Sequence, residues 1–414
     1  MVVGGSLAGV RAVEGARAAG FDGRITLIGA EPHLPYDRPP LSKAFLDSSD
    51  APVRTYKDER VLRDELRVRL LLSTRATGLD TARRTVVVGD ERVPYDAVVL
   101  ATGATARELP GTGGLAGVHT VRTVDDATAI RLAFDQGART VVVGAGFVGA
   151  EVAAAARRRG LDVVVVEMAA TPLAHAVGPE MGAACAALHV LHGTDVRYGV
   201  RVTALEGDGR VERVVLSDGT VLPADLVVVG VGAVPATGWL AGSGLTVDNG
   251  VLCDETLYAG VPGVYAAGDI ARWHNPMFDR RMRLEHWTSA AEQGAVAARN
   301  AVDPDAAKPY TTVPYFWSDW HGCRVQFVGI PGADEVRVVA GRIGTAGRLV
   351  ALYREGDRLV GALTVDAPTH VMKYRRLIAR RESWQEGLAL AAVLDDTGGT
   401  RATLKDAKPL PASD

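Results

Sequence analysis

A strand, a glycine-rich turn, a helix, a second strand and an acidic residue follow one another twice in this chain of 414 residues. The first copy runs from Val2 to Glu31 and the second from Val141 to Glu167. The strands are runs of Val and Ile without polar alternation, which indicates strands buried on both faces of a parallel sheet. The repeat therefore predicts an α/β protein with two Rossmann-like domains.

Both turns have the glycine spacing of a dinucleotide-binding fingerprint. Small residues there allow a tight turn and bring the helix N-terminus, with its free N–H groups and positive dipole end, against a pyrophosphate. The acid after each second strand, Glu31 or Glu167, is placed to accept hydrogen bonds from a ribose diol. The fingerprint positions are Gly4, Ser6, Ala8 and Gly9 in the first copy and Gly144, Gly146, Phe147, Val148 and Gly149 in the second. Two such units predict two dinucleotides bound to one chain, and Ser6 is small enough to replace the usual middle glycine.

The segments between and after the two units indicate three domains. Buried strands that end in glycine follow each unit, at 98–103, 226–232 and 264–269, and 285–300 has the pattern of a helix. From about Pro309 strand-like segments appear at 324–329, 348–354 and 358–365, followed by a basic helix near 371–381. We expect a discontinuous first domain at 1–106 and 234–308, a second at 107–233, and a small C-terminal α+β domain at 309–414.

Charge and cysteine content exclude several classes of function. The net charge of −3 gives no general attraction to nucleic acid or to a membrane surface. The three cysteines, Cys185, Cys253 and Cys323, form no C-x-x-C pair, so we expect neither a redox dithiol nor a metal site. No secretory signal is visible, and the uncharged run 226–247 contains too many glycines for a membrane helix. We expect a cytoplasmic protein.

Further motifs lie in the same order as in a known family. They are Pro-Tyr-Asp-Arg-Pro-Pro-Leu-Ser-Lys at 35–43, Ala-Thr-Gly at 101–103, Val-Arg-Thr at 121–123, 144–151, Gly-Asp at 268–269, Glu-His-Trp at 285–287 with Ala-Glu-Gln at 291–293, and Tyr-Phe-Trp-Ser-Asp at 315–319. The chain resembles, over nearly its whole length, the NADH-dependent ferredoxin reductases of the putidaredoxin reductase type. These flavoproteins have the glutathione-reductase-like fold and serve cytochrome P450 and Rieske oxygenases.

The resemblance implies that the first unit binds FAD and the second NAD. In the FAD site, Gly4, Ser6, Ala8 and Gly9 would lie at the pyrophosphate, Glu31 at the ribose and Ala76 beside the adenine. Arg38 and Arg122 would neutralise phosphate, Asp269 would accept from the ribityl chain, Trp287 would lie near the flavin ring, and Thr102 and Gly103 would complete the site. Gly144, Gly146, Phe147, Val148, Gly149, Glu151, Glu167 and Gly232 would bind NAD. Because Glu167 is acidic and no arginine follows it directly, NADH is favoured over NADPH.

Lys43 has the greatest consequence for the chemistry. Disulfide reductases of this fold carry a redox cysteine in this region, and here no cysteine lies within the first 184 residues. The resemblance implies that Lys43 lies near flavin N5 and pairs with Glu151, so that the flavin itself passes electrons onward. Glu151, two residues after Gly149, is expected on the first turn of its helix. Two departures from the family are His175, where arginine is common, and 319–321, Asp-Trp-His in place of Asp-Gln-aromatic.

The expected partner is an acidic iron–sulfur ferredoxin that docks on a local arginine patch. Candidates are Arg280, Arg281 and Arg283, and Arg375, Arg376, Arg380 and Arg381. A rubredoxin reductase or a cysteine-independent NADH oxidase is the alternative within the same chemistry. A flavoprotein of the apoptosis-inducing-factor type is the alternative of a different class, and a flavin monooxygenase is disfavoured by the third domain.

Overall fold

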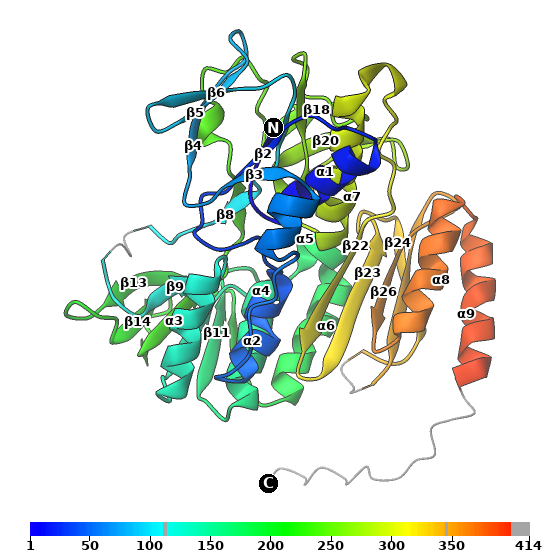
Figure 1. Ribbon diagram of the computed structural model, residues 1–414. Helices are drawn as coiled ribbons and strands as arrows, with labels where there is room; N and C mark the ends of the chain where they lie inside the picture. Colours follow the sequence, from blue (N-terminus) through cyan, green and yellow to red (C-terminus); the bar gives the residue numbers. More distant parts are fainter. Residues whose placement is uncertain (111–113, 344–346, 399–414) are drawn as a thin grey trace, which may run out of the picture.

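The computed structural model describes residues 1–110, 114–343 and 347–398. Its first sheet is parallel, with strand order β19-β7-β1-β2-β3. These strands are β1 Val2–Val3, β2 Ile25–Ile28, β3 Val68–Leu71, β7 Val98–Leu100 and β19 Val264–Ala266. Helices α1 (Leu7–Ala18) and α7 (Trp287–Val302) lie side by side against it (Figure 1). A Cβ on Gly294 would lie 2.2 Å from Ala8 O, so glycine is what allows the two helices to touch.

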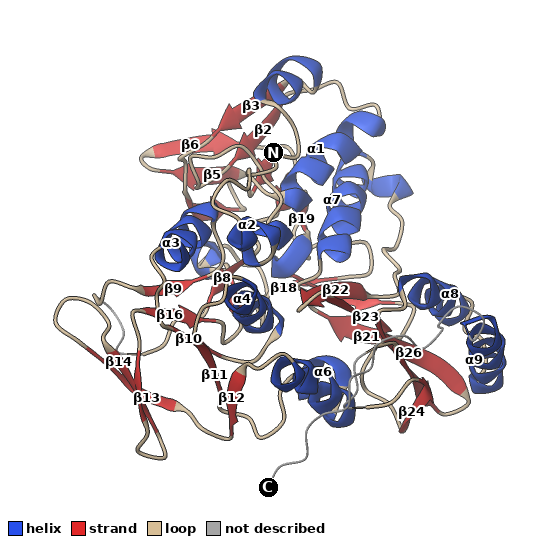
Figure 2. Cartoon of the chain, turned by 90° about the horizontal axis from the view of Figure 1, so that it is seen from below, coloured by secondary structure: helices blue, strands red, loops and turns tan. Residues whose placement is uncertain are grey.

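The second sheet repeats this parallel arrangement, with strand order β12-β11-β10-β16-β9. Figure 2 shows these strands one after another in this order. They are β9 Val118–Thr120, β10 Thr140–Val143, β11 Val163–Glu167, β12 Asp195–Tyr198 and β16 Leu226–Val229. Helices α3 (Val124–Asp135), α4 (Phe147–Arg158) and α6 (Pro179–Leu191) accompany it. The two Rossmann-like units predicted from the repeat are confirmed.

Small ribbons connect and extend these sheets. Strands β8 (Ala104–Ala106) and β17 (Ala233–Pro235) pair where the chain passes from the first sheet to the second and back. We propose that the boundaries between the first two domains lie in this ribbon. The remaining strands are β4 Ala76–Asp80, β5 Thr85–Val88, β6 Glu91–Pro94, β13 Val202–Glu206, β14 Arg213–Leu216, β15 Val221–Pro223, β18 Val251–Cys253, β20 Ala271–Asn275 and β21 Arg280–Met282. Short helices are α2 (Ala44–Asp47) and α5 (Ala174–Val177).

The C-terminal unit is an antiparallel sheet of order β22-β23-β26-β25-β24 covered by two helices, α8 and α9 (Figure 1). Its strands are β22 Tyr315–Trp320, β23 Cys323–Gly329, β24 Glu335–Ala340, β25 Leu349–Glu355 and β26 Arg358–Val365. Its helices are α8 Pro368–Ala379 and α9 Trp384–Gly398. Strands β22 and β24 and helix α9 were not expected, α7 begins two residues later than expected, and the part of the predicted third domain at 399–414 lies outside the described residues.

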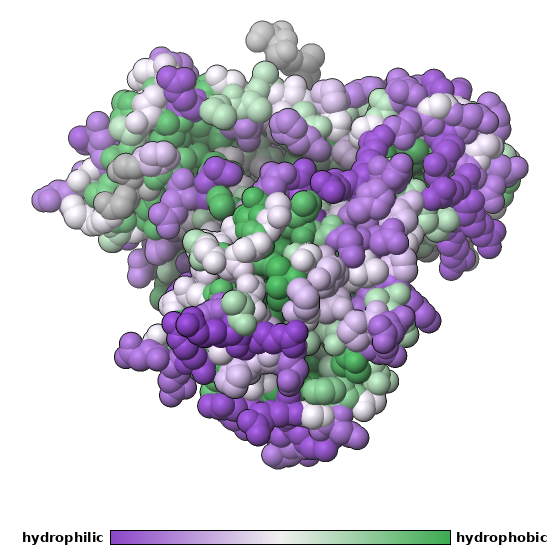
Figure 3. Space-filling model, turned by 90° about the horizontal axis from the view of Figure 1, so that it is seen from above, coloured by the Kyte–Doolittle hydropathy of each residue, from purple (hydrophilic) through white to green (hydrophobic). Residues whose placement is uncertain are grey.

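The C-terminal sheet packs directly on helices of the second unit. One apolar cluster contains Ala150 of α4, Met181 of α6, and Trp320, Phe327 and Tyr353 of the sheet. The Tyr353 hydroxyl also donates to Val177 O at 2.6 Å. On the face seen in Figure 3, hydrophilic residues surround a narrower apolar stretch near the centre. None of the described helices is long and apolar enough to cross a membrane.

Candidate functional site

The first fingerprint turn has no room for side chains at its glycines. Gly4 has φ +128°, and a Cβ on it would lie 2.0 Å from Ala101 O. A Cβ on Gly9 would lie 2.0 Å from Gly4 O. The N-cap residue Ser6 forms no hydrogen bond to the helix with its side chain in the described chain. The first N–H groups of α1 therefore remain suited to an anion at this helix end.

The second turn has the same construction. Gly144 has φ +101°, and a Cβ on Gly149 would lie 2.0 Å from Gly144 O. Glu167 bends back over this turn, where its carboxylate accepts from the backbone N–H of Ala145 and of Ala169, both at 2.7 Å. Its negative charge is thus fixed beside the N-terminus of α4. Phe147 and the partly exposed Val148 begin that helix, and Gly232, with φ +99°, follows β16.

Most of the predicted FAD-binding side chains form one polar chain. Arg38 bonds to Glu31 (Nη2–Oε1, 2.5 Å), to the Ser6 hydroxyl (3.3 Å) and to Arg122 O (2.6 Å). Tyr36, which sequence reasoning gave no role, donates to Glu31 Oε2 at 2.5 Å, and its burial raises its pKa to about 12. Arg122 then pairs with Asp269 at 3.0 Å. The chain joins the first turn to the end of β19.

Of the remaining predicted FAD residues, Gly103 lies at the other end of this chain, Thr102 and Trp287 bond to neighbouring segments, and Ala76 lies apart. A Cβ on Gly103 would lie 3.1 Å from the Arg122 guanidinium, so the absence of a side chain at Gly103 leaves room for that group. The Thr102 hydroxyl donates to Ala236 O at 3.1 Å. Trp287 donates to Asp37 at 2.9 Å and meets the Trp317 ring edge-on, with centroids 6.3 Å apart. Ala76, at the start of β4, is not brought into contact with these groups by any described bond.

One buried polar atom near Asp269 has no partner. His286, the N-cap of α7, is half-buried, and its buried Nδ1 atom has no hydrogen-bond partner among the described residues. Burial lowers the pKa of His286 to about 4, so the ring is neutral near pH 7. An unsatisfied buried atom is costly, and a polar ligand removes that cost. The free N–H groups at the first turn, the Arg38 and Arg122 guanidiniums and His286 Nδ1 together form a set of polar groups that fits FAD.

Lys43 and Glu151 meet where the domains join. Lys43 Nζ lies 2.8 Å from Glu151 Oε1, with the Lys43 and Glu151 side chains 17% and 4% exposed. The Ser42 hydroxyl donates to Glu151 Oε2 at 2.5 Å, and the Ser318 hydroxyl donates to Glu151 Oε1. The sequence patterns indicated no role for either serine. Glu151 was expected on the first turn of its helix, but α4 begins at Phe147, so Glu151 lies on the second turn and is held by these three donors.

Behind Ser318 lies a group of aromatic rings. Trp320 donates its indole N–H to the Ser318 hydroxyl at 2.6 Å and stacks on His189, with centroids 5.3 Å apart. His321 Nε2 lies 3.1 Å from His189 Nδ1, and His192 stacks on His321 at 4.5 Å. Burial, followed by the neighbouring histidines, lowers the pKa of His189 to about 4 and that of His321 to about 3. The His189 and His321 rings are therefore neutral near pH 7.

This histidine group makes stability depend on pH. In the unfolded chain the imidazoles take up protons near the ordinary pKa of about 6.5, whereas the folded protein resists protonation down to about 4 and 3. The free energy of unfolding therefore falls as pH falls from about 6.5 to about 4. Between pH 7 and pH 5 the free energy of unfolding of H321N should fall by about 1 kcal/mol less than that of the wild type, as measured by urea unfolding.

Asparagine is a suitable replacement because His321 and Gly322 form a two-residue hairpin turn with φ +51° and +84°. Asparagine tolerates such left-handed backbone. The exposed His175, changed to asparagine, serves as the control and should retain the wild-type pH dependence. The same pH dependence in H321N as in the wild type would show that this group does not cause the acid sensitivity.

Several arginines of the predicted docking patches bond to other groups of the same chain. Arg280 pairs with Glu355, Arg283 with Glu285 at 2.7 Å, Arg375 donates to Val313 O at 3.1 Å, and Arg381 to Pro276 O at 2.9 Å. Arg281, Arg376 and Arg380 form no side-chain bond within the described residues. Arg375 is therefore a structural tie to the loop before β22, while Arg376 and Arg380 remain available for docking.

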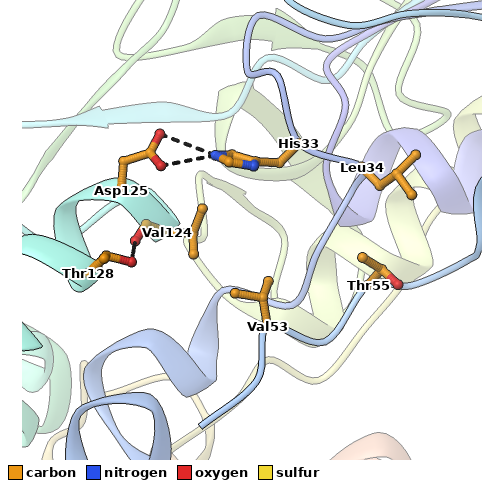
Figure 4. Close-up of a pocket in the computed structure, with 7 residues that line it drawn as sticks. All are labelled: His33, Leu34, Val53, Thr55, Val124, Asp125 and Thr128. Atoms are coloured by element: carbon orange, nitrogen blue, oxygen red, sulfur yellow. Dashed lines mark hydrogen bonds and ion pairs between the residues drawn. The ribbon is translucent and has the colours of Figure 1, made fainter. Parts of the chain in front are cut away.

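An open hollow of about 330 Å³ lies on the α3 side of the molecule (Figure 4). His33 lines one edge of it and bonds to Asp125 at 3.0 Å. Its lining residues are His33, Leu34, Val53, Thr55, Val124, Asp125 and Thr128, and none is a predicted site residue. Among residues 1–110, 114–343 and 347–398, no group of three or more His, Cys, Asp or Glu side chains is arranged to hold a metal ion.

Comparison with known proteins gives matches over nearly the whole chain. A family model described as pyridine nucleotide-disulphide oxidoreductase matches residues 1–294, and one described as reductase C-terminal matches 315–396. Rhodocoxin reductase of Rhodococcus erythropolis is 35% identical over 92% of this chain and 89% of its own length. Putidaredoxin reductase of Pseudomonas putida is 34% identical over 92% of both chains.

Solved structures agree with these matches. A ferredoxin reductase for the CYP199A2 system from Rhodopseudomonas palustris is 36% identical, with a TM-score of 0.86 over 92% of this chain and 94% of that one. The covalent putidaredoxin reductase–putidaredoxin complex is 31% identical, with a TM-score of 0.87 over 95% of this chain and 98% of that one. The resemblance noted in the sequence is confirmed: the chain belongs to the pyridine nucleotide-disulphide oxidoreductase family, in its branch of ferredoxin–NAD(+) reductases.

Proposed function

We propose that this chain is an FAD-dependent NADH:ferredoxin reductase. It passes electrons from NADH one at a time to an iron–sulfur ferredoxin that serves a cytochrome P450 or Rieske oxygenase. The observation that carries the proposal is the Lys43–Glu151 pair, which joins the first fingerprint unit to the helix of the second at 2.8 Å. Lys43 stands in the region where disulfide reductases of this fold carry a redox cysteine, and the three cysteines lie in other parts of the chain.

The residues of this chain bind and position the two dinucleotides. The N-termini of α1 and α4 attract the pyrophosphates, and Arg38 and Arg122 add positive charge beside the first. Glu151 orients the nicotinamide, and the Lys43 ammonium favours negative charge developing next to it. Bound FAD supplies the capacity to take up two electrons together and release them singly. Positioning accounts for the rate acceleration that we expect here, since no acid–base triad is required.

A comparison of electron acceptors tests the proposal. The purified holoprotein should oxidise NADH rapidly with an oxygenase-type [2Fe–2S] ferredoxin and slowly with oxygen alone. Equal or faster turnover with rubredoxin or oxygen would favour the rubredoxin reductase or NADH oxidase alternatives. FAD binding without turnover of any acceptor would favour the apoptosis-inducing-factor type. The proposal also places the protein in the cytoplasm, where its cysteines remain free.

We predict that Glu167 determines the choice of NADH. Its carboxylate is fixed beside Ala145, two residues before α4, where it would repel a 2′-phosphate. In E167Q the ratio of kcat/KM for NADH to that for NADPH should fall about tenfold, which corresponds to about 1.4 kcal/mol. E206Q, which neutralises an exposed carboxylate paired with Arg213, is the control and should keep the wild-type ratio. An unchanged ratio in E167Q would assign the selectivity to other residues.

We predict that Arg376 and Arg380 contribute to ferredoxin docking. Charge reversal at both positions should raise the KM for an acidic ferredoxin about tenfold at low salt, and the difference from wild type should shrink as salt is added. Reduction of ferricyanide by NADH, which needs no protein docking, should stay unchanged. R60E/R63E, at two exposed arginines on a different part of the surface, is the control for the same added negative charge. A KM in the double variant equal to that in R60E/R63E would place the docking surface elsewhere.

A further inference from the structure

We propose that Ser318 and Trp320 are positioning residues for Glu151, so that the C-terminal unit sets the geometry of the nicotinamide site. This inference rests on the proposed function. Ser318 and Trp320 both lie on β22, are 0% exposed, and form a line from Trp320 through Ser318 to Glu151. Glu151 belongs to the second fingerprint unit, and Lys43 to the first, so β22 contributes a third side to the centre.

The chemistry of indole gives this line a fixed direction. The Trp320 N–H can only donate, so the Ser318 oxygen must accept at 2.6 Å. With its oxygen accepting from Trp320, the Ser318 hydroxyl is free to point its hydrogen at Glu151 Oε1. The hydroxyl is thereby fixed as a donor to a carboxylate, and hydrogen bonds to charged groups are among the stronger ones.

The carboxylate of Glu151 is held from both sides. Oε1 meets Lys43 Nζ at 2.8 Å and Ser318, and Oε2 meets Ser42 at 2.5 Å. Ser42 and Lys43 are adjacent in sequence and approach from one unit, whereas Ser318 approaches from another. Without Ser318 the carboxylate keeps both of its other partners and can turn toward them. The bond from Ser318 thus determines orientation.

Trp320 is itself held firmly. It stacks on His189 of α6 with centroids 5.3 Å apart and lies 6.1 Å from the ring of Phe147, the first residue of α4. The tight turn at His321–Gly322 closes directly after it. A rigid aromatic anchor at this place transmits the position of the C-terminal sheet to Glu151.

Three single variants and one double variant test the proposal in the holoenzyme. S318A and W320F should each lower the single-turnover rate constant for FAD reduction by NADH, S318A by about tenfold and W320F by somewhat less. The affinity for NAD+, measured by calorimetry, should change less than threefold, because the effect is on orientation. S318T, which keeps a hydroxyl, should recover most of the rate lost in S318A. In the double variant S318A/W320F the rate should equal that of S318A, because Trp320 acts through Ser318.

W273F is the matched control for loss of a buried indole bond. Trp273 is also 0% exposed and donates its N–H to Tyr310 O at 3.2 Å, but it lies in the core of the first unit. W273F and W320F should lose similar thermal stability, and only W320F should slow FAD reduction. Multiplicative effects of S318A and W320F, or equal slowing in W273F, would overturn the proposal.

A second readout does not depend on turnover. In 15N-tryptophan-labelled protein, the indole N–H signal assigned to Trp320 through W320F should be protected from solvent exchange, and S318A should abolish this protection. E151Q should shift the same signal, since it changes the far end of the line. If wild-type protein fails to oxidise NADH, the proposed function fails while this measurement still decides the inference. Rapid exchange of the Trp320 N–H in the wild type would overturn the inference alone.

Discussion

K43M should lower the rate constant for NADH-dependent reduction of bound FAD by about a hundredfold, because it removes the ammonium that favours the negative charge developing next to it. It also removes one partner of a buried ion pair and should therefore lower stability. Loss of one partner from such a pair lowers the free energy of unfolding by about 3–5 kcal/mol when the other charge stays buried. Here the Ser42 and Ser318 hydroxyls still donate to Glu151, which reduces the cost to about 3 kcal/mol. Methionine has a similar length and no charge, so packing is retained. The measurement is stopped-flow absorbance of the bound flavin, with thermal unfolding in parallel.

K57M is the matched control for this substitution. Lys57 also pairs with a glutamate, Glu14, at 3.0 Å, but the pair is more exposed, with the Lys57 and Glu14 side chains 36% and 23% exposed. An exposed pair contributes about 0–1 kcal/mol, so K57M should leave both stability and FAD reduction near wild type. Wild-type reduction rates in K43M would show that the ammonium is not needed, and the assignment of Lys43 to the reaction centre would be wrong.

One methyl group added at a fingerprint glycine should abolish binding of the dinucleotide at that turn and leave the other dinucleotide bound. A Cβ at Gly9 or Gly149 would lie 2.0 Å from the carbonyl of Gly4 or Gly144, so the turn must move. G9A should yield protein without bound FAD. G149A should keep FAD and its colour but lose NADH-dependent reduction. Each should also lose about 1–3 kcal/mol of stability through overpacking. Flavin content after gel filtration and calorimetry with NAD+ measure the two effects.

G238A is the control for the glycine series. Gly238 has an ordinary negative φ range, and a Cβ there would meet nothing within 4 Å. This variant should therefore bind FAD and NAD+ as the wild type does. Loss of FAD in G149A but not in G9A would reverse the order of the two sites along the chain. Retention of both dinucleotides in both variants would contradict the assignment of these turns as binding sites.

The two dinucleotide-binding units could be predicted from the sequence because their signal is local. Apolar runs, closely spaced glycines and the acid after the second strand all lie within about thirty residues, the length of one βαβ unit. The pairing of Lys43 with Glu151 came from the resemblance to a family, since 108 residues separate the two and no local pattern relates them. Strand β22 escaped prediction: Tyr-Phe-Trp-Ser-Asp-Trp mixes large aromatics with Ser318 and Asp319, and does not alternate by polarity.

The sequence by itself therefore determined the fold class, the presence of two nucleotide-binding units and the absence of a cysteine near Lys43, because each of these depends on short stretches of chain. Only the tertiary structure decided what surrounds Glu151. Ser42 of the first unit and Ser318 of the C-terminal unit converge there, with Trp320 behind Ser318, and Arg375 turns inward to Val313. Such contacts depend on how separate sheets and helices pack, and packing brings together residues whose spacing in the sequence carries no periodic signal.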